Sequence, residues 1–254
     1  MSPAKSHDLL AFVAITYAVT WVAMVPAILA FRGWASPPMP LVVLGAVIGS
    51  AAPSLVALAL VRWRGEGVRS LFALDRPTSL AQRLGWCALA LLLPAMLHLS
   101  GAAIASLFGA PASVWAMGLP SNGDQWGILI IAPFGEEVGW RGLLQRRAEQ
   151  RWGAVRASLW VGVVWALWHV PMFLARPPGA LDLVAGVVTI LAGAFVFAAL
   201  FRASGGSVWV AIAAHAGVHC DNTTRVGGPA LGVTCAMFVV AAIGCGAWMA
   251  KDKA

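Results

Sequence analysis

The segment that decides the fold is Gly135-Glu136-Glu137-Val138-Gly139-Trp140-Arg141-Gly142, which places three charged residues inside an apolar run. Residues 128–134 before it read Ile-Leu-Ile-Ile-Ala-Pro-Phe, and two leucines follow it. A charged side chain at the depth of a lipid bilayer is costly, so it usually faces a bundle interior and marks a functional site. The pattern therefore predicts a membrane-embedded helix that carries a polar site.

The spacing of the three charges predicts different roles for the two glutamates. Glu137 and Arg141 are four residues apart and can pair on one face of a helix. Glu136 lies about 100° around the same helix and can point at something else. We therefore expect Arg141 to hold Glu137 and to leave Glu136 available for chemistry.

The composition of the chain is that of a polytopic membrane protein. Of its 254 residues, 60% are hydrophobic and 11% are charged, whereas about a quarter of the residues in a soluble domain are charged. The net charge of +7 would suggest nucleic-acid binding in a soluble chain, but here the basic residues lie in short loops between apolar runs. They are better explained as topology signals, and no nucleic-acid partner is expected.

The apolar runs predict the architecture, because about 20 apolar residues are enough to cross the hydrocarbon core as a helix. We expect an all-α, polytopic bundle of about eight transmembrane helices that forms a single membrane-embedded domain over residues 1–254. The stretch 84–123 is divided into one span and a loop, because its second half is rich in helix breakers. The predicted spans cover residues 9–31, 40–61, 85–109, 126–145, 157–175, 182–201, 207–220 and 229–249.

The distribution of positive charge predicts the orientation of these spans. With the amino terminus inside, the inside segments hold 13 Lys and Arg residues and the outside loops hold 3. Cytoplasmic loops carry such an excess in membrane proteins. We therefore expect a multi-pass protein of the plasma membrane with both termini in the cytoplasm.

Two other predicted spans carry histidines near the depth of Glu136. The span 157–175 contains Trp165-Ala166-Leu167-Trp168-His169, and the span 207–220 contains His215-Ala216-Gly217-Val218-His219. From the helical rise, Glu136, His169 and His215 lie ~15, ~18 and ~12 Å from the ends of their helices. The shared depth predicts one polar site. By contrast, we interpret the lone His98 as structural, the tryptophans as packing residues, and Gly139 and Gly217 as points of close helix contact.

The chemistry open to this set of residues is hydrolysis. The sequence has no Gly-x-Ser-x-Gly elbow, no paired aspartates and no His-Glu-x-x-His motif. A carboxylate can act as a general base on a water, while histidines stabilise an oxyanion or hold a metal ion.

At these residues the sequence resembles the CPBP family of intramembrane proteases, also called the Abi or type II CAAX protease family. The family motifs are Glu-Glu-x-x-x-Arg, Phe-x-x-x-His and His-x-x-x-Asn/Asp on successive helices. The first is complete from Glu136 to Arg141, and the second has Trp165 in place of the usual phenylalanine before His169.

The third motif departs further from the family pattern. It begins at His215, but the position four residues later is His219 instead of asparagine or aspartate. Asp221 and Asn222 are close in sequence but out of register. The resemblance covers residues 126–222.

The resemblance implies an intramembrane endopeptidase that acts on a membrane-associated protein or peptide, with the lipid bilayer and that substrate as its partners. Glu136 would activate the hydrolytic water, supported by Glu137 and Arg141. His169 and His215 would complete the site, and His219 would stand where the family has an amide that helps to hold the oxyanion.

Two alternatives remain open for the role of a metal ion. His169, His215 and His219 could supply three nitrogens to zinc and leave a fourth position for the water. In the version that we prefer, no metal is bound and His219 donates a hydrogen bond to the oxyanion.

Two other classes of function remain as alternatives to a peptidase. The altered third motif favours a non-catalytic membrane partner, such as an immunity or scaffold protein with the same fold. A transporter is also compatible with buried charges in interrupted spans.

Overall fold

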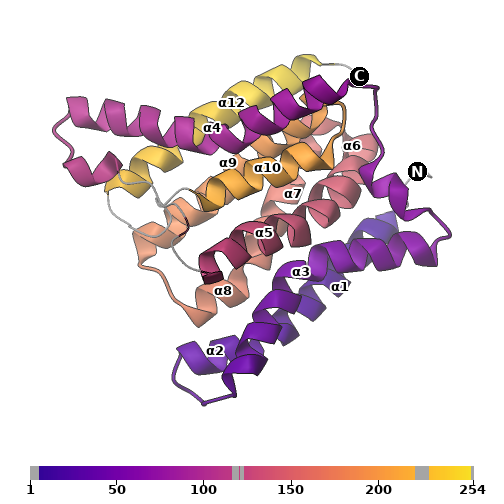
Figure 1. Ribbon diagram of the computed structural model, residues 1–254, viewed down its shortest axis with the longest axis horizontal. Helices are drawn as coiled ribbons and strands as arrows, with labels where there is room; N and C mark the ends of the chain where they lie inside the picture. Colours follow the sequence, from indigo (N-terminus) through magenta and orange to yellow (C-terminus); the bar gives the residue numbers. More distant parts are fainter. Residues whose placement is uncertain (1–5, 116–119, 121–122, 221–228, 253–254) are drawn as a thin grey trace.

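A computed structural model describes residues 6–115, 120, 123–220 and 229–252 of the chain. These residues form helices joined by short connections, and the described part of the chain contains no β-strand (Figure 1). The predicted all-α bundle is therefore confirmed.

The described part of the chain is helical at each of the eight predicted positions. The helices are α1 (Ser6–Ala23), α2 (Val25–Phe31), α3 (Met39–Trp63), α4 (Leu80–Leu107), α5 (Gly123–Glu137), α6 (Arg146–Trp152), α7 (Ala154–Trp168), α8 (Val170–Ala175), α9 (Ala180–Ala203), α10 (Val208–His219) and α12 (Pro229–Lys251). Short 3₁₀ turns, η1 (Val68–Phe72) and η2 (Ala112–Trp115), lie in two connections, and a π-helix, η3 (Val138–Gln145), joins α5 to α6.

The number of eight membrane crossings is not confirmed. By length and hydrophobicity, five of the described helices can cross a membrane, or six if α1 and α2, which are bent by 41° at their junction, form one span. At two of the other predicted spans, α10 has 12 residues, fewer than a crossing helix needs, and α5 has 15 residues before it continues as η3. Both of these shorter helices carry predicted site residues.

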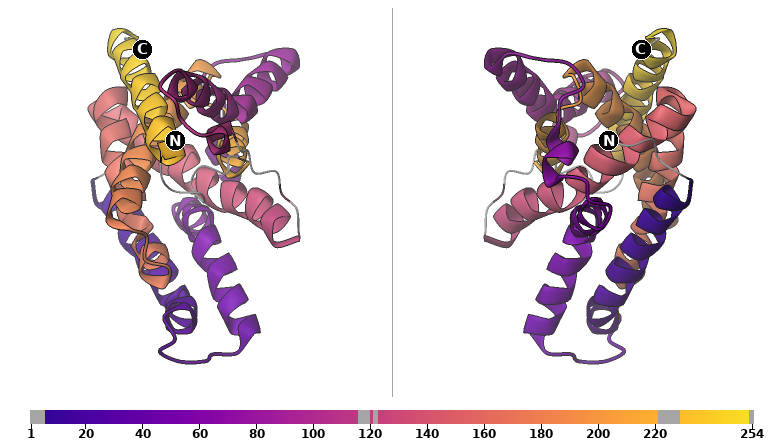
Figure 2. Two further views of the ribbon diagram at one scale, coloured as in Figure 1. Left: turned by 90° about the vertical axis from the view of Figure 1, so that its left-hand side faces the viewer. Right: turned by 90° about the vertical axis from the view of Figure 1, so that its right-hand side faces the viewer.

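The helices are arranged so that the predicted site lies inside the bundle. In Figure 1, α1 and α3 form one side, α4 and α12 form the opposite side, and α5, α7, α9 and α10 lie between them. Figure 2 shows α1 and α3 as a pair that extends away from the rest of the bundle. The start of α1 and the end of α12 lie on the same side, at the right in Figure 1, together with α6.

Close packing of these helices depends on two of the glycines identified in the sequence. A Cβ atom at Gly139 would lie 2.3 Å from the carbonyl oxygen of Pro53, and one at Gly217 would lie 2.3 Å from that of Leu91. Any side chain at these positions would therefore push η3 away from α3, or α10 away from α4. The prediction that these glycines permit close helix contact is confirmed.

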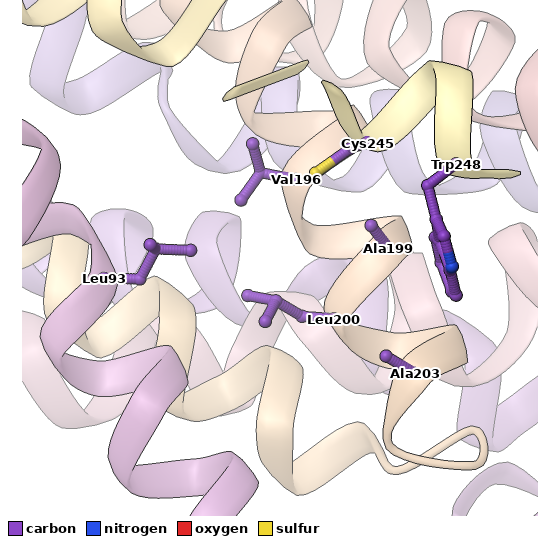
Figure 3. A pocket seen from close by; sticks show the side chains of 7 residues that line it. All are labelled: Leu93, Val196, Ala199, Leu200, Ala203, Cys245 and Trp248. Carbon is purple, nitrogen blue, oxygen red and sulfur yellow. The ribbon is translucent and has the colours of Figure 1, made fainter. Parts of the chain in front are cut away.

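Two apolar pockets lie away from the predicted site residues. One, of about 140 Å³, lies between α4, α9 and α12 (Figure 3), and the other, of about 320 Å³, lies between α9 and α12. Neither lining contains a carboxylate or an imidazole, so neither pocket is a candidate for hydrolysis. The first pocket is lined by Leu93, Val196, Ala199, Leu200, Ala203, Cys245 and Trp248.

Candidate active site

The charged motif lies where α5 changes into the π-helix η3. Glu136 and Glu137 end α5, and Arg141 lies within η3, all of whose residues are buried. A π-helix has wider turns than an α-helix, is rare, and is often found at functional sites. The sequence pattern did not predict this change of helix type.

Glu137 is held by two partners and is fully buried. Its two oxygens accept hydrogen bonds from Nη1 of Arg141 at 2.9 and 2.8 Å, as the spacing of the motif predicted. Oε1 also lies 2.7 Å from Nδ1 of His215 on α10. A buried carboxylate is stable only when it is paired and hydrogen-bonded, and both conditions are met here.

Arg141 is also held by aromatic rings on two other helices. Its guanidinium carbon lies 4.7 Å from the ring centroid of Trp165 on α7 and 4.7 Å from that of Phe197 on α9. Cation–π contacts strengthen when the cation is shielded from water. The Glu137–Arg141 pair therefore connects η3 to α7 and α9.

Glu136 is buried but has fewer partners than its neighbour. Its Oε2 accepts a hydrogen bond of 2.9 Å from the indole Nε1 of Trp165. Its Oε1 lies 4.0 Å from Nε2 of His215, and the indole of Trp140 also interacts with the carboxylate but lacks good hydrogen-bond geometry. The two glutamates thus approach the two nitrogens of one histidine, although the sequence predicted only that they would point in different directions.

His169 lies in the turn between α7 and α8. Its Nδ1 is 2.8 Å from the carbonyl oxygen of Trp165. A carbonyl oxygen only accepts hydrogen bonds, so Nδ1 carries the proton, and Nε2 of the neutral ring presents its lone pair. His169 joins the site through Trp165, whose ring packs against both His169 and His215 at centroid distances of 5.7 Å.

The rings of His215 and His219 are stacked, with their centroids 4.9 Å apart and their planes at 16°. Nearly parallel rings direct their nitrogens alongside each other instead of toward one shared point. In addition, Nδ1 of His215 and Nδ1 of His169 already have partners.

The alternative of a three-histidine zinc site does not fit this arrangement. In the part of the chain that the structure describes, no group of three or more His, Cys, Asp or Glu side chains is placed to hold a metal ion. The other acceptors near the third motif, Asp221 and Asn222, lie outside the described residues.

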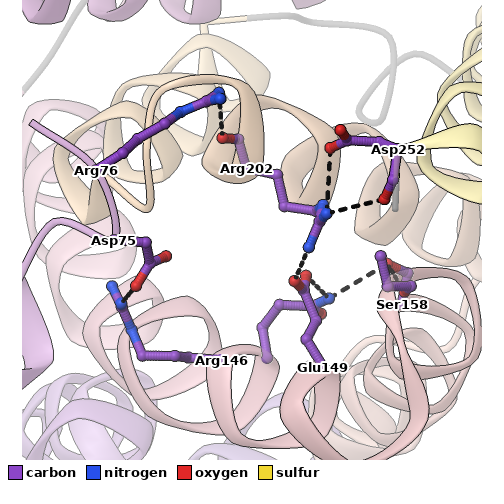
Figure 4. A network of polar contacts seen from close by, with 9 residues as sticks. Asp75, Arg76, Arg146, Glu149, Ser158, Arg202 and Asp252 are labelled. Atoms are coloured by element: carbon purple, nitrogen blue, oxygen red, sulfur yellow. Dashed lines mark hydrogen bonds and ion pairs between the residues drawn. The ribbon is translucent and has the colours of Figure 1, made fainter. Parts of the chain in front are cut away.

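A second set of polar and charged residues, whose central pair Glu149 and Arg202 is half-buried, lies at the end of η3 and beyond it (Figure 4). We call it the Glu149 network, and it consists of Gln145, Glu149, Ser158, Arg202 and Asp252. Gln145 and Arg202 donate to the two oxygens of Glu149, each at 2.7 Å, and Arg202 also reaches Asp252 at 3.1 Å. Burial raises the pKa of the Glu149 carboxyl, while its two donors act in the opposite direction. The network fastens α6 to the ends of α9 and α12.

Arg146 and Arg147 have roles that the sequence analysis missed. Arg146 pairs with Asp75 and donates to the carbonyl oxygens of Ala73 and Gly206, and burial lowers the pKa of its guanidinium. Arg147 pairs with Glu66 at 2.8 Å. Both arginines were interpreted as topology signals, but they are buried and fasten the start of α6 to the loop between α3 and α4.

Residues 124–220 match the family described as type II CAAX prenyl endopeptidase, Rce1-like. This match confirms the family resemblance. The matched segment contains all six predicted site residues, from Glu136 to His219.

A second comparison covers a shorter stretch of this chain. Over 49 residues it is 35% identical to CAAX prenyl protease 2 of Methanococcus maripaludis, which is 19% of this chain and 18% of that protein. The alignment thus spans less than a fifth of the relative's length. Together with the five or six apolar helices, the family match supports a multi-pass membrane protein with a protease-like segment.

Proposed function

We propose that this chain is an intramembrane endopeptidase that hydrolyses a peptide bond in a membrane-associated protein or peptide through a water activated by Glu136. The asymmetry between two adjacent buried carboxylates supports this proposal. Glu137 is engaged by Arg141 and His215, whereas Glu136 accepts one hydrogen bond and keeps an oxygen 4.0 Å from an imidazole nitrogen. Only the second arrangement leaves a carboxylate oxygen able to take a proton from water.

The reaction needs no group beyond water, the peptide and these side chains. Glu136 takes a proton from the water, and the water oxygen forms a bond to the carbonyl carbon while the C=O π electrons move to the carbonyl oxygen. In the tetrahedral intermediate, the oxyanion electrons then re-form the C=O double bond as the C–N bond breaks. Glu136 gives its proton to the leaving amine, so the base of the first step is the acid of the second.

The histidines have separate roles in this proposal. Nδ1 of His215 is directed at Glu137, so Nε2 is the nitrogen that faces the reacting atoms beside Glu136. Glu137 and Arg141 therefore orient His215, as the acid of a catalytic triad orients its histidine. Nε2 of neutral His169 accepts a hydrogen bond from the water or the amine, and His219 donates to the oxyanion.

The test is peptide cleavage by the purified chain in detergent. Wild-type protein and Glu136→Gln are incubated with a set of membrane-associated peptides, and the products are identified by mass spectrometry. We expect cleavage by the wild type alone. Equal cleavage by both proteins would overturn the role of Glu136.

A non-catalytic membrane partner is the second candidate, and His219 is the observation that favours it. The family has an amide or a carboxyl at this position, and the imidazole here is stacked on His215. If this candidate is correct, neither wild-type protein nor His219→Asn cleaves any peptide of the set.

We also propose that residues 1–254 form one membrane-embedded domain of the plasma membrane with both termini in the cytoplasm. The start of α1 and the end of α12 lie on the same side of the bundle, which supports an even number of crossings. Reporter domains fused to each terminus test this orientation. A phosphatase that is active at either end would contradict it, because phosphatase needs an oxidising compartment to fold.

A further inference from the structure

Trp165, the aromatic residue of the second motif, contacts four of the six predicted site residues. Its indole Nε1 donates to Oε2 of Glu136 at 2.9 Å, and its carbonyl oxygen accepts from Nδ1 of His169 at 2.8 Å. Its ring lies against the guanidinium of Arg141 and packs edge-on against His215. One buried side chain on α7 therefore touches residues from α5, η3, α10 and its own helix end.

We propose that Trp165 is the positioning residue of the catalytic base, an inference that rests on the function proposed above. Its indole N–H holds Oε2 of Glu136, so that Oε1 is the oxygen directed toward His215 and the water. The family motif has phenylalanine at this position, and phenylalanine cannot donate a hydrogen bond. Aromatic packing alone would be satisfied by phenylalanine, so it does not explain the indole N–H that Trp165 supplies in this chain.

The hydrogen bond acts on both the geometry and the charge of Glu136. A glutamate side chain has several rotatable bonds, and a fixed donor on one oxygen limits where the other can point. A donor to a carboxylate also favours its ionised form, which is the form that a base needs. The other charged or titratable groups that face Glu136 are Glu137, Arg141 and His215.

Trp168 provides a matched control on the same helix. It is fully buried, and its indole Nε1 donates at 2.8 Å to Oγ1 of Thr20 on α1. Trp165→Phe and Trp168→Phe therefore each remove a buried indole donor from α7. Only the donor of Trp165 reaches Glu136.

The experiment compares peptide cleavage by the two variants across a range of pH. For Trp165→Phe we expect kcat to fall about 10- to 100-fold, the effect of losing one hydrogen bond to a charged group. We expect KM to change little and the acidic limb of kcat/KM to move to higher pH. Trp168→Phe should lower thermal stability, retain most of kcat and leave the acidic limb in place.

A second variant separates the N–H donor from the packing of the ring. Trp165→His keeps a ring N–H, so it should recover kcat relative to Trp165→Phe and keep the acidic limb near the wild-type position. Equal kcat and equal limbs for folded Trp165→Phe and Trp168→Phe would overturn the inference. If Trp165→Phe fails to fold, Trp165→His decides the question. An acidic limb of kcat/KM that has moved to higher pH in folded Trp165→His would then overturn the inference.

Failure of this inference can be distinguished from failure of the proposed function. If Glu136→Gln is inactive while Trp165→Phe behaves like its control, only the role of Trp165 is wrong. If Glu136→Gln remains active, the assignment of the base is wrong, and the role of Trp165 is overturned with it.

Discussion

Two polar clusters along one run of helix, one buried and one half-buried, hold their carboxylates in different ways. In the Glu149 network, each oxygen of Glu149 has its own donor at 2.7 Å. Around the motif, Glu137 is equally well bound, but Glu136 accepts a hydrogen bond on Oε2 and has Nε2 of His215 4.0 Å from Oε1. A position shielded from solvent therefore does not by itself mark a functional carboxylate, and the better indication is the looser contact of 4.0 Å between Oε1 of Glu136 and Nε2 of His215.

The largest expected difference between the two clusters is in activity, when Glu136 and Glu149 are each replaced by glutamine. Glu136→Gln should lower kcat/KM about 10²- to 10⁴-fold, because an amide cannot take the proton of the water. Its thermal unfolding should stay near that of the wild type. Glu149→Gln should keep activity close to that of the wild type, since Glu149 touches no predicted site residue in the contacts described above. Its stability should be lower, because the pair with Arg202 is lost. Loss of activity in both variants at equal stability would remove the distinction.

Removing the arginine from each cluster should lower stability by different amounts. Arg141→Ala leaves fully buried Glu137 without its main counter-charge, which costs about 3–5 kcal/mol. Arg202 has a side chain 16% exposed to solvent, so we expect Arg202→Ala to cost only about 1–3 kcal/mol. Denaturant unfolding in the same detergent measures both values. Equal losses would show that the two clusters are equally important for folding.

His219→Asn should have a smaller effect, and it also tests for a metal ion. If His219 donates to the oxyanion, asparagine can replace it, and kcat should change less than about tenfold. Wild-type activity should then be unaffected by a strong chelator. If His219 is instead a zinc ligand, the substitution removes metal and activity together, and zinc restores the activity of chelated wild-type protein.

The smallest effect concerns the pH dependence of stability at Glu149. Burial places the pKa of its carboxyl above the ordinary value of 4.5. Its contribution to stability is therefore complete below that pH and declines as pH rises through the pKa of the folded state. The Tm of the wild-type protein should thus fall relative to the Tm of Glu149→Gln as pH rises. A difference that grows in favour of the wild type would mean that pairing with Arg202 outweighs burial.

The sequence predicted those parts of the fold and site that depend on local spacing and composition. The all-helical bundle follows from the apolar runs, and the Glu137–Arg141 pair follows from the four-residue separation. The shared depth of Glu136 and His215 follows from helical rise, and the two side chains do approach each other. These predictions needed no knowledge of which helices are neighbours.

The features that the sequence did not predict depend on how helices pack. The hydrogen bond from Trp165 to Glu136 joins α7 to α5, and nothing in either segment alone indicates it. Arg146 was counted among the topology signals, and its partner, Asp75, is too far away in the sequence for the pair to be predicted from spacing. The count of eight spans assumed that every apolar run crosses the membrane, and it stays unconfirmed because α10, with 12 residues, is shorter than a crossing helix.

The π-helix η3 sets the direction in which the side chains of α6 point relative to those of α5. One extra residue in an α-helix turns everything beyond it by about 100° around the axis. The residues before η3 direct Glu136 and Glu137 toward α7 and α10, and those after it direct Arg146 and Arg147 toward the loop between α3 and α4. Deleting one residue from η3 would let the segment return to an α-helix, but it would turn one of these polar faces away from its partners. The wide turn thus lets a single helical rod serve two interfaces that a regular helix could not align at once.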